Sequence, residues 1–597
     1  MSHSAPAALP APAGSTRTLH AAAGWDARHW LRESDGGLLL LALGVGAGAA
    51  GLGIVFRWLI RTFTVLFSGH ADYAAVPGAS NPWVPWLGPW FVLLTPVVAG
   101  LLYGPLVRRF APEARGHGVP EVMYAVARNG GRIRPRVAAV KALASALCIG
   151  GGGSVGREGP IVQIGSAFGS TLGGVVRLSE ARLRVLVACG AAGGIAATFN
   201  APLAGVFFAM ELILVDFAAQ SFGMVVLAAV TSSAIARAVL GDEPFLTLPD
   251  FVLAHLWEYL LIAALGVLAG FVGVAFTRVL YAIEDACDWA WRGPEWLRPA
   301  AGGLLLGGLL LVLPQMYGVG YPVLGDAVDG RYAIGFLLVL LVGKVVATSL
   351  TIGIGGSGGV FAPSLFVGAM LGAAFGETAA QLSGGGVSQV GTYALIGMGA
   401  VFAGSARAPI TAVVILFELT GEYSIILPMM LAIVIATGVS HRLSDETVYT
   451  LKLRRRGIDL GRPERIRAHD RVADLMLPVP EPVREGDRLA DVAGRLAEER
   501  SGALPVVDAA GVFHGVVTAR AAAEELAAGG HDADPVAMVE EWPVRLRADD
   551  SVADGLAALE RSGAPAVPVH GPADGPDADD VVGWLTFQAA LAGSVRT

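Results

Sequence analysis

Apolar residues fill the chain almost without interruption from residue 36 to about residue 440. Several of these apolar runs approach the roughly 20 residues that an α-helix needs to cross a bilayer. We predict membrane spans at 37–60, 86–107, 224–240, 256–280, 300–316, 334–352 and 425–439. Most of the chain is therefore expected to be an all-α polytopic membrane protein.

Shorter apolar pieces, interrupted by glycine and proline, lie between these spans. They cover 137–150, 161–176, 185–197, 203–215, 361–375 and 410–419. Irregular backbone is tolerated at membrane depth only where it is buried in protein or lines a cavity. Short, interrupted segments of this kind indicate discontinuous helices around a binding site near the middle of the membrane.

The pattern changes after residue 456, where long apolar spans end and Asp, Glu and Arg become frequent. Two similar blocks follow, and each is predicted as a βαββα alternation of short strands and helices. We divide the chain into a disordered tail, a membrane domain, a linker and two soluble modules. Their predicted ranges are 1–18, 19–456 (with related halves at about 36–240 and 255–440), 457–470, 471–530 and 534–594.

Composition and charge narrow the class of protein. The chain is 54% hydrophobic and only 15% charged, whereas soluble domains average about 25% charged residues. Its net charge of −8 argues against nucleic acid as a partner. Arginine and lysine concentrate at 108–136 and 442–456, and the loop at 241–250 is acidic. Because basic loops stay in the cytoplasm, both ends of the chain are predicted to be cytoplasmic.

The membrane domain contains an internal repeat, which is visible in three ordered pairs of motifs. Their matching prolines are separated by 202, 203 and 207 residues. The pairs are Gly116-His-Gly-Val-Pro120 with Gly318-Val-Gly-Tyr-Pro322, Gly152-Gly-Ser-Val-Gly-Arg-Glu-Gly-Pro160 with Gly355-Gly-Ser-Gly-Gly-Val-Phe-Ala-Pro363, and Asn200-Ala-Pro with Arg407-Ala-Pro. Two related halves follow, and inverted halves with a site at the midplane are the commoner solution in transporters.

The glycine loops of this repeat precede predicted helices. A helix N-terminus carries about half a positive charge, and its free N–H groups can replace the hydration shell of an anion. Glu158 lies in such a loop, and carboxylates inside membranes are costly and usually functional. When ionised, Glu158 can occupy the donors that would bind an anion, and when protonated it can swing away. It is therefore a candidate gate and proton carrier.

These motifs resemble the anion pathway of the CLC family of chloride channels and chloride–proton exchangers. The resemblance covers roughly residues 30–456, and the C-terminal blocks resemble the tandem CBS modules of many family members. It implies an inverted repeat and a homodimer, and the expected location is the bacterial inner membrane. It makes Glu158 the gating glutamate. Its implied anion-binding and pathway residues are His117, Gly156, Arg157, Gly159, Val360, Phe361, Tyr449, Gly116, Gly118, Pro120, Gly359 and Pro363.

Two positions depart from the family pattern. His117 stands where chloride-selective members often have serine, and its imidazole can donate to an anion or, if protonated, bind it more strongly. Leu212 stands where many exchangers have an internal proton-transferring glutamate, and an aliphatic side chain cannot relay a proton. Neighbouring Glu211 has a repeat partner in Glu418, which favours a structural role for both. Proton-coupled exchange is the main hypothesis, and a passive chloride channel is the alternative.

Other functions have less support from the sequence. A divalent-cation transporter would need clustered acids in its spans, and the pathway loops offer only Glu158. The pattern Gly152-Gly-Ser-Val-Gly156 fits a hydrolase nucleophile elbow, but it recurs in both halves without His and Asp partners, so no enzyme and no metal site are predicted. Thr518 and Thr586 lack the following acid that often holds ribose in CBS modules. No cofactor is therefore expected, although adenine nucleotide remains conceivable there.

Overall fold

The computed structural model describes residues 27–241 and 255–458, residue 589, and residues 471–586 apart from 485, 500–501, 509–511, 529, 531–533, 536–545, 563–565 and 573–579. The predicted tail, most of the acidic loop at 241–250, most of the linker and the end of the second module lie outside the described residues. The chain divides into two compact units, Met1–Ile458 and Asp459–Thr597.

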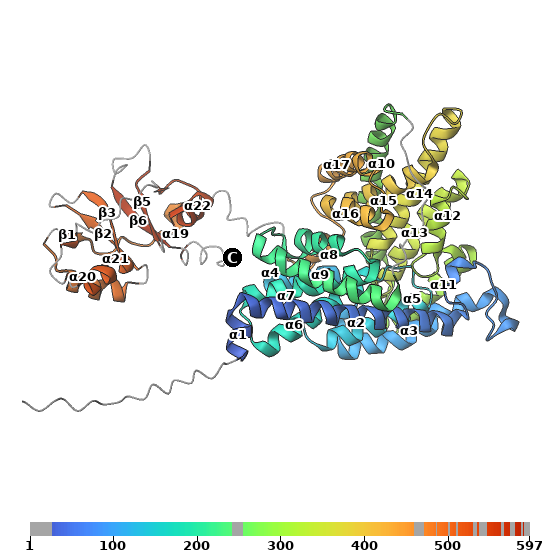
Figure 1. Cartoon of the computed structure of the whole chain (residues 1–597), viewed down its shortest axis with the longest axis horizontal. Coiled ribbons are helices and arrows are strands. Elements are labelled where there is room, and N and C mark those ends of the chain that lie inside the picture. The colour runs from blue at the N-terminus through green and yellow to red at the C-terminus, as the bar shows by residue number, and fades with distance from the viewer. Residues whose placement is uncertain are drawn as a thin grey trace, which may run out of the picture. The chain divides into compact units, whose positions relative to one another are not determined.

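The membrane unit consists of helices throughout its described part (Figure 1). After α1 (Ala27–Glu33), the first half contains α2 (Asp35–Ser68), α3 (Phe91–Phe110), α4 (Val119–Arg128), α5 (Arg136–Gly150), α6 (Glu158–Val176), α7 (Glu180–Phe199), α8 (Pro202–Phe208) and α9 (Ala219–Leu240). The second half contains α10 (Glu258–Ala290), α11 (Arg298–Val312), α12 (Tyr321–Val328), α13 (Ile334–Gly353), α14 (Phe361–Leu382), α15 (Val390–Ala406), α16 (Pro409–Thr420) and α17 (Ile426–Leu443), followed by α18 (Thr450–Arg454).

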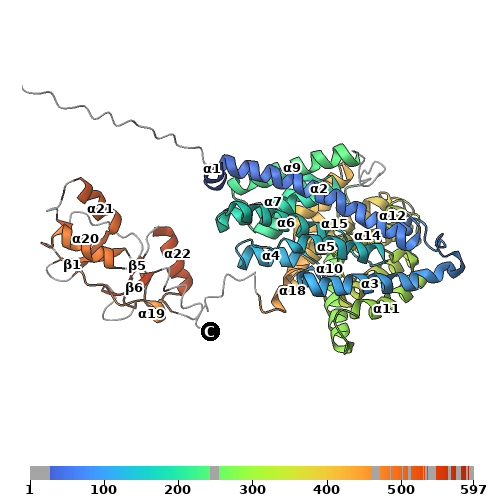
Figure 2. The same ribbon diagram turned by 90° about the horizontal axis from the view of Figure 1, so that it is seen from below.

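The packing of these helices repeats between the halves. In the first half α7 packs against α2, α6 and α9, and in the second half α15 packs in the same way against α10, α14 and α17 (Figures 1 and 2). Matching helices also meet across the halves, α3 with α11 and α8 with α16. The predicted internal repeat is therefore confirmed in three dimensions.

Small residues allow the central helices to approach closely. A Cβ atom added at Gly165 of α6 would collide with the carbonyl of Gly190 in α7, and the reverse holds as well. Gly368 of α14 and Gly397 of α15 form the equivalent contact. Helix pairs in lipid associate through such close backbone contacts, because there is no hydrophobic force between them.

Eight helices among the described residues are long and apolar enough to cross a membrane, and they correct the predicted spans in three places. The predicted span 300–316 is the 15-residue helix α11, which ends before Pro314. The pieces at 185–197 and 361–375 belong to α7 and α14, of 20 and 22 residues. Their glycines contact neighbouring helices and do not interrupt the helix.

The C-terminal unit contains two three-stranded sheets with the same topology. The first has the order β1 (Val483–Arg484), β2 (Ala503–Val507), β3 (Phe513–Thr518), and the second β4 (Leu546–Arg547), β5 (Ala566–His570), β6 (Val581–Thr586). In each sheet the first pair is parallel and the second antiparallel, with a bulge near the end of the middle strand. The helices are α19 (Val472–Leu475), α20 (Leu489–Glu498), α21 (Ala519–Ala527) and α22 (Val552–Ser562).

The start of the first predicted module packs with the second sheet. Val472 of α19 is buried in a cluster with Leu546, Val567 and Leu585, and Leu477 pairs with Trp584. The segment at 471–477 therefore packs into the core of the second sheet. Sequence order alone does not show onto which of two similar sheets a preceding segment folds.

Candidate functional site

The glycine loops of the two halves meet in the interior of the membrane unit. Gly156 and Gly359 exchange two backbone hydrogen bonds of 2.7 Å. The amide of Gly116 donates to the carbonyl of Gly356 at 3.0 Å, and the amide of Gly358 donates to the carbonyl of Gly116 at 3.3 Å. Predicted pathway loops that lie far apart in sequence are thus joined by main-chain contacts.

Two features of these loops require glycine. Gly116 and Gly118 have φ values of +80° and +86°, in the left-handed region that residues with a side chain rarely adopt. A side chain at Gly159 would collide with the carbonyl of His117 and would lie 3.0 Å from the Cα of Gly359. Pro120 lies in the first turn of α4, and Pro363 is the third residue of α14, where the missing N–H costs no hydrogen bond.

The helices α6 and α14 begin at these joined loops, at Glu158 and Phe361. The first N–H groups of a helix have no partner within the helix. Among the described residues, the amides of Val360 and Phe361 have no hydrogen-bond acceptor. The ring of Phe361 packs against Phe402, with centroids 4.5 Å apart. Unpaired N–H groups at a helix start form a place for an anion.

Glu158 is buried at the start of α6, with 1% of its surface exposed. One carboxyl oxygen, Oε1, accepts a hydrogen bond of 2.6 Å from the hydroxyl of Tyr321. The other, Oε2, lies 3.4 Å from the amide of Ala362 in the first turn of α14. The carboxylate therefore takes up a helix-end donor that an anion would otherwise use.

A cavity of about 390 Å³ extends from Tyr321, and we call it the Tyr321 cavity. Its lining includes Arg57, Arg157 and Arg237. The guanidinium of Arg157 lies over the Tyr321 ring, 5.2 Å from its centroid, and also donates to the carbonyl of Thr198 at 3.4 Å. With three arginines against one aspartate, Asp72, the lining is net positive and attracts anions.

His117 and Tyr449 supply further donors. His117 is buried with 1% of its surface exposed, and neither ring nitrogen has a hydrogen-bond partner among the described residues. Tyr449 is equally buried, and the described residues provide no acceptor for its hydroxyl. Tyr281 contacts the surroundings of both residues. Its ring lies 6.1 Å from the His117 ring, and its hydroxyl donates at 2.7 Å to the carbonyl of Val448, the residue before Tyr449.

Two buried lysines hold the first loop of each half. The ammonium of Lys141 donates to the carbonyls of Ala114 and Gly116 at 2.9 and 2.7 Å. The ammonium of Lys344 donates to the carbonyls of Gly318 and Val319 and to the Ser154 hydroxyl, at 2.8–3.1 Å. Both lysines therefore fix loop geometry. They lie 203 residues apart, the same separation as Pro160 and Pro363 of the repeat, and this signal was available in the sequence.

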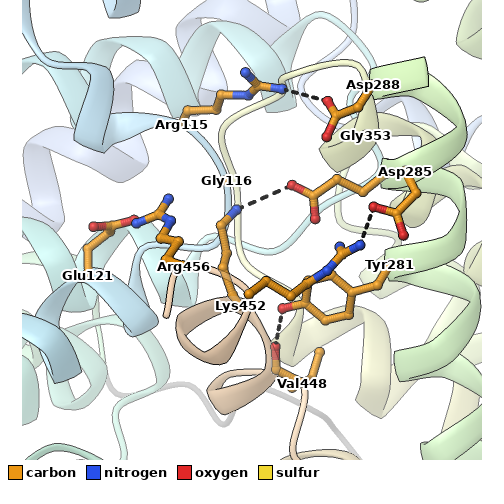
Figure 3. A network of polar contacts seen from close by, with 12 residues as sticks. Arg115, Gly116, Glu121, Tyr281, Asp285, Asp288, Gly353, Val448, Lys452 and Arg456 are labelled. Carbon is orange, nitrogen blue, oxygen red and sulfur yellow. Dashed lines mark hydrogen bonds and ion pairs between the residues drawn. The ribbon is translucent and has the colours of Figure 1, made fainter. Parts of the chain in front are cut away.

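A second cavity, of about 370 Å³, lies beside α18, and we call it the α18 cavity. Figure 3 shows the ion pairs around it. Arg455 binds Asp285, Arg115 lies 3.8 Å from Asp288, and Arg456 binds Glu121 at 2.6 Å. The hydrogen bond to Asp285 raises the pKa of the Arg455 guanidinium. Lys452, which the sequence analysis also missed, extends from α18 toward Gly116.

Glu211 and Glu418 form reciprocal caps between α8 and α16. Glu211 accepts from the amides of Ile410 and Thr411 at 3.2 and 2.8 Å. Glu418 accepts from the amides of Leu203 and Ala204 at 2.9 and 2.6 Å. Both carboxylates thus satisfy helix N-termini, which confirms the predicted structural role. Leu212 is buried beside Glu211 with 6% exposed.

The chain matches two family models. Residues 99–441 match the family described as voltage gated chloride channel, and residues 472–528 match the CBS domain. The predicted fold class, a helical membrane domain with a C-terminal α/β region, is confirmed by these matches together with the structure.

Curated relatives and solved structures agree with the family models. The chain is 34% identical to a putative chloride channel protein ClcB-like of Ralstonia nicotianae, over 70% of this chain and 97% of that protein. It is 38% identical to the H(+)/Cl(−) exchange transporter ClcA of Vibrio parahaemolyticus, over 61% of this chain and 79% of that protein. A slow cyanobacterial Cl−/H+ antiporter superposes with a TM-score of 0.62 at 27% identity, over 70% of this chain and 97% of that one. A eukaryotic CLC transporter shares the fold over 92% of this chain and 97% of its own, with a TM-score of 0.60 at 22% identity.

Proposed function

The chain belongs to the voltage gated chloride channel family of integral membrane transport proteins, and we propose that it exchanges chloride, or a similar small monovalent anion, for protons. One observation carries this proposal. Donors without acceptors, namely the amides of Val360 and Phe361, the His117 ring and the Tyr449 hydroxyl, accumulate in the interior around two helix N-termini. Buried donors normally have partners, and an anion is the kind of acceptor that donors at a helix N-terminus take up.

Glu158 would supply both the gate and the proton site. Its carboxylate occupies a helix-end donor while it is ionised, so protonation would free that donor for chloride. Coupling to protons is supported by the relatives named as H(+)/Cl(−) exchangers or antiporters. Leu212 carries no proton, so the proton would reach Glu158 by a route other than a carboxylate at that position.

The remaining features of the proposal concern assembly and location. We place the protein in a bacterial inner membrane as a homodimer, with both termini and the α18 cavity on the cytoplasmic side. The basic stretches at 108–136 and 442–456 support this orientation. We expect no adenine nucleotide on the C-terminal unit, because the Thr518 hydroxyl caps α21 by accepting from the Ala521 amide and no carboxylate follows it.

Flux measurements in liposomes test the proposed function. Purified protein is reconstituted, a chloride gradient is imposed, and chloride efflux and proton uptake are recorded together for the wild type and Glu158→Gln. We expect the chloride gradient to drive protons uphill in the wild type, and Glu158→Gln to abolish proton movement while chloride still crosses. Chloride flux without coupled protons in the wild type would reduce the protein to a channel, and absence of any monovalent anion flux would refute anion transport.

A further inference from the structure

The three buried lysines of the membrane unit differ in how their ammonium groups are satisfied. Lys141 makes two hydrogen bonds to carbonyls, and Lys344 makes three hydrogen bonds. Lys452 has 9% of its surface exposed. Its only charged partner among the described residues is Glu284, with Nζ 3.6 Å from Oε1, beyond hydrogen-bond length. An ammonium has three donors, and those of Lys452 lack acceptors in the described part of the chain.

The position of Lys452 shows what its missing acceptor would be. Its side chain lines the α18 cavity, and its ammonium faces Gly116, because a Cβ atom added at Gly116 would lie 2.6 Å from Nζ. The next residue is His117, whose two ring nitrogens are buried without partners. The Lys452 ammonium, which makes no hydrogen bond in the described part of the chain, therefore lies beside Gly116 of the pathway loop (Figure 3). Buried ring nitrogens without partners, such as those of His117, require an explanation such as a bound ion.

Resting on the proposed function, we propose that Lys452 determines anion affinity at this end of the pathway. Its ammonium binds the anion that enters through the α18 cavity, and the anion then moves on to His117. On binding to Lys452, the anion displaces the carboxylate of Glu284 from the ammonium. The other basic residues of the cavity already have carboxylates at contact distance, as Arg456 has Glu121 and Arg455 has Asp285.

The carboxylate of Glu284 explains how a buried lysine can line an anion pathway without trapping the anion. A lone buried cation would hold a halide too tightly, because an ion must leave as readily as it enters. A carboxylate at 3.6 Å balances the charge of the empty site and competes with the anion. Binding then exchanges one ion pair for another, which keeps affinity moderate.

Chloride titration of the full-length protein tests this proposal. Sodium chloride binding is measured by calorimetry for the wild type, Lys452→Met, Glu284→Gln and Arg456→Gln, and the chloride KM on the α18 side is measured in liposomes. We expect Lys452→Met to weaken chloride binding and raise this KM about tenfold, as loss of a charged hydrogen bond does. Glu284→Gln should tighten binding, because the competing carboxylate is gone. Arg456→Gln removes the same charge from the same cavity and should change affinity much less.

The outcomes separate this proposal from the proposed function. Wild-type chloride flux together with unchanged affinity in Lys452→Met would overturn the role of Lys452 and leave anion exchange standing. An equal loss of chloride affinity in Arg456→Gln would also overturn it, because the effect would then come from the total positive charge of the cavity and not from Lys452. If Lys452→Met does not fold, Glu284→Gln decides, and unchanged or weaker binding in that variant overturns the proposal. Absence of chloride flux in the wild type would refute the proposed function as well.

Discussion

The hydroxyl of Tyr321 donates a hydrogen bond to Glu158, the proposed gate. A hydrogen bond donated to a carboxylate stabilises the ionised form relative to the protonated one, and this bond is 2.6 Å long in a buried site. Tyr321 therefore favours the ionised state, in which Glu158 accepts from the Ala362 amide of α14. Tyr321 comes from the second half and Glu158 from the first, so both halves contribute to the proposed gate.

Tyr321→Phe should shift the pH dependence of transport. Without the hydroxyl, Glu158 takes up a proton at higher pH, so chloride efflux should persist to higher pH, with its midpoint raised by about one unit. The measurement is chloride efflux from liposomes as a function of pH. Tyr332→Phe is the matched control, since its hydroxyl bonds Asp326 at 3.1 Å and not a pathway residue. A pH profile identical to that of the wild type would show that Tyr321 does not hold the gate.

Several site residues were predictable because their chemistry is unusual for a membrane. Glu158 was found because a carboxylate in an apolar glycine loop needs a function, and it lies where two helix N-termini meet. Tyr321 was missed because its repeat counterpart is Val119, whose side chain has no polar group, so comparing the halves gave no reason to select it. Lys452 was missed because it lies in a basic stretch, and a run of charges usually indicates a solvated face. Only the folded chain shows that it is buried.

At the scale of elements, the reciprocal caps connect the two halves. Glu211 and Glu418 each bind the first amides of a helix from the opposite half. A negative charge at a helix N-terminus also interacts favourably with the helix dipole. These two carboxylates therefore stabilise the contact of α8 with α16, and neither is free for proton transfer.

Glu418→Ala should lower the stability of the membrane unit by about 1–3 kcal/mol, because the amides of Leu203 and Ala204 lose their acceptor. Glu211→Ala should have a similar effect at α16. The midpoint of thermal unfolding in detergent measures this loss. Glu377→Ala is the control, since Glu377 bonds only Gln381 of its own helix in the described part of the chain. An unchanged midpoint in both cap variants would mean that solvent replaces the carboxylates without cost.

The hydrophobic runs predicted those helices whose length is set by the thickness of the bilayer. Long spans such as α2 and α10 were located because a bilayer requires about 20 apolar residues. Errors arose where packing, not lipid, decides the helix. The glycines of α7 and α14 resembled interruptions, but they are contact points between buried helices. The repeat offset identified equivalent loops, and it did not show that Gly116 contacts Gly356 and Gly156 contacts Gly359.

At the scale of the whole chain, the membrane unit carries every residue assigned here to the anion pathway. All of them precede Ile458, where the first compact unit ends. The ClcB-like relative of Ralstonia nicotianae is matched over 97% of its length by 70% of this chain, so little of that protein lies outside the match. The membrane unit should therefore fold and transport without the C-terminal unit.

Ending the chain after Ile458 tests this expectation. The shortened protein should insert, unfold at a similar temperature and exchange chloride for protons with the same stoichiometry, because no pathway donor is removed. Coupled flux in liposomes and thermal unfolding in detergent are the measurements. The matched control ends the chain after Ser444, which also removes Tyr449 and Lys452, and it should lose chloride affinity. If the longer truncation product folds but has lost coupled exchange, the C-terminal unit is required for transport itself, and the pathway residues of the membrane unit are not sufficient.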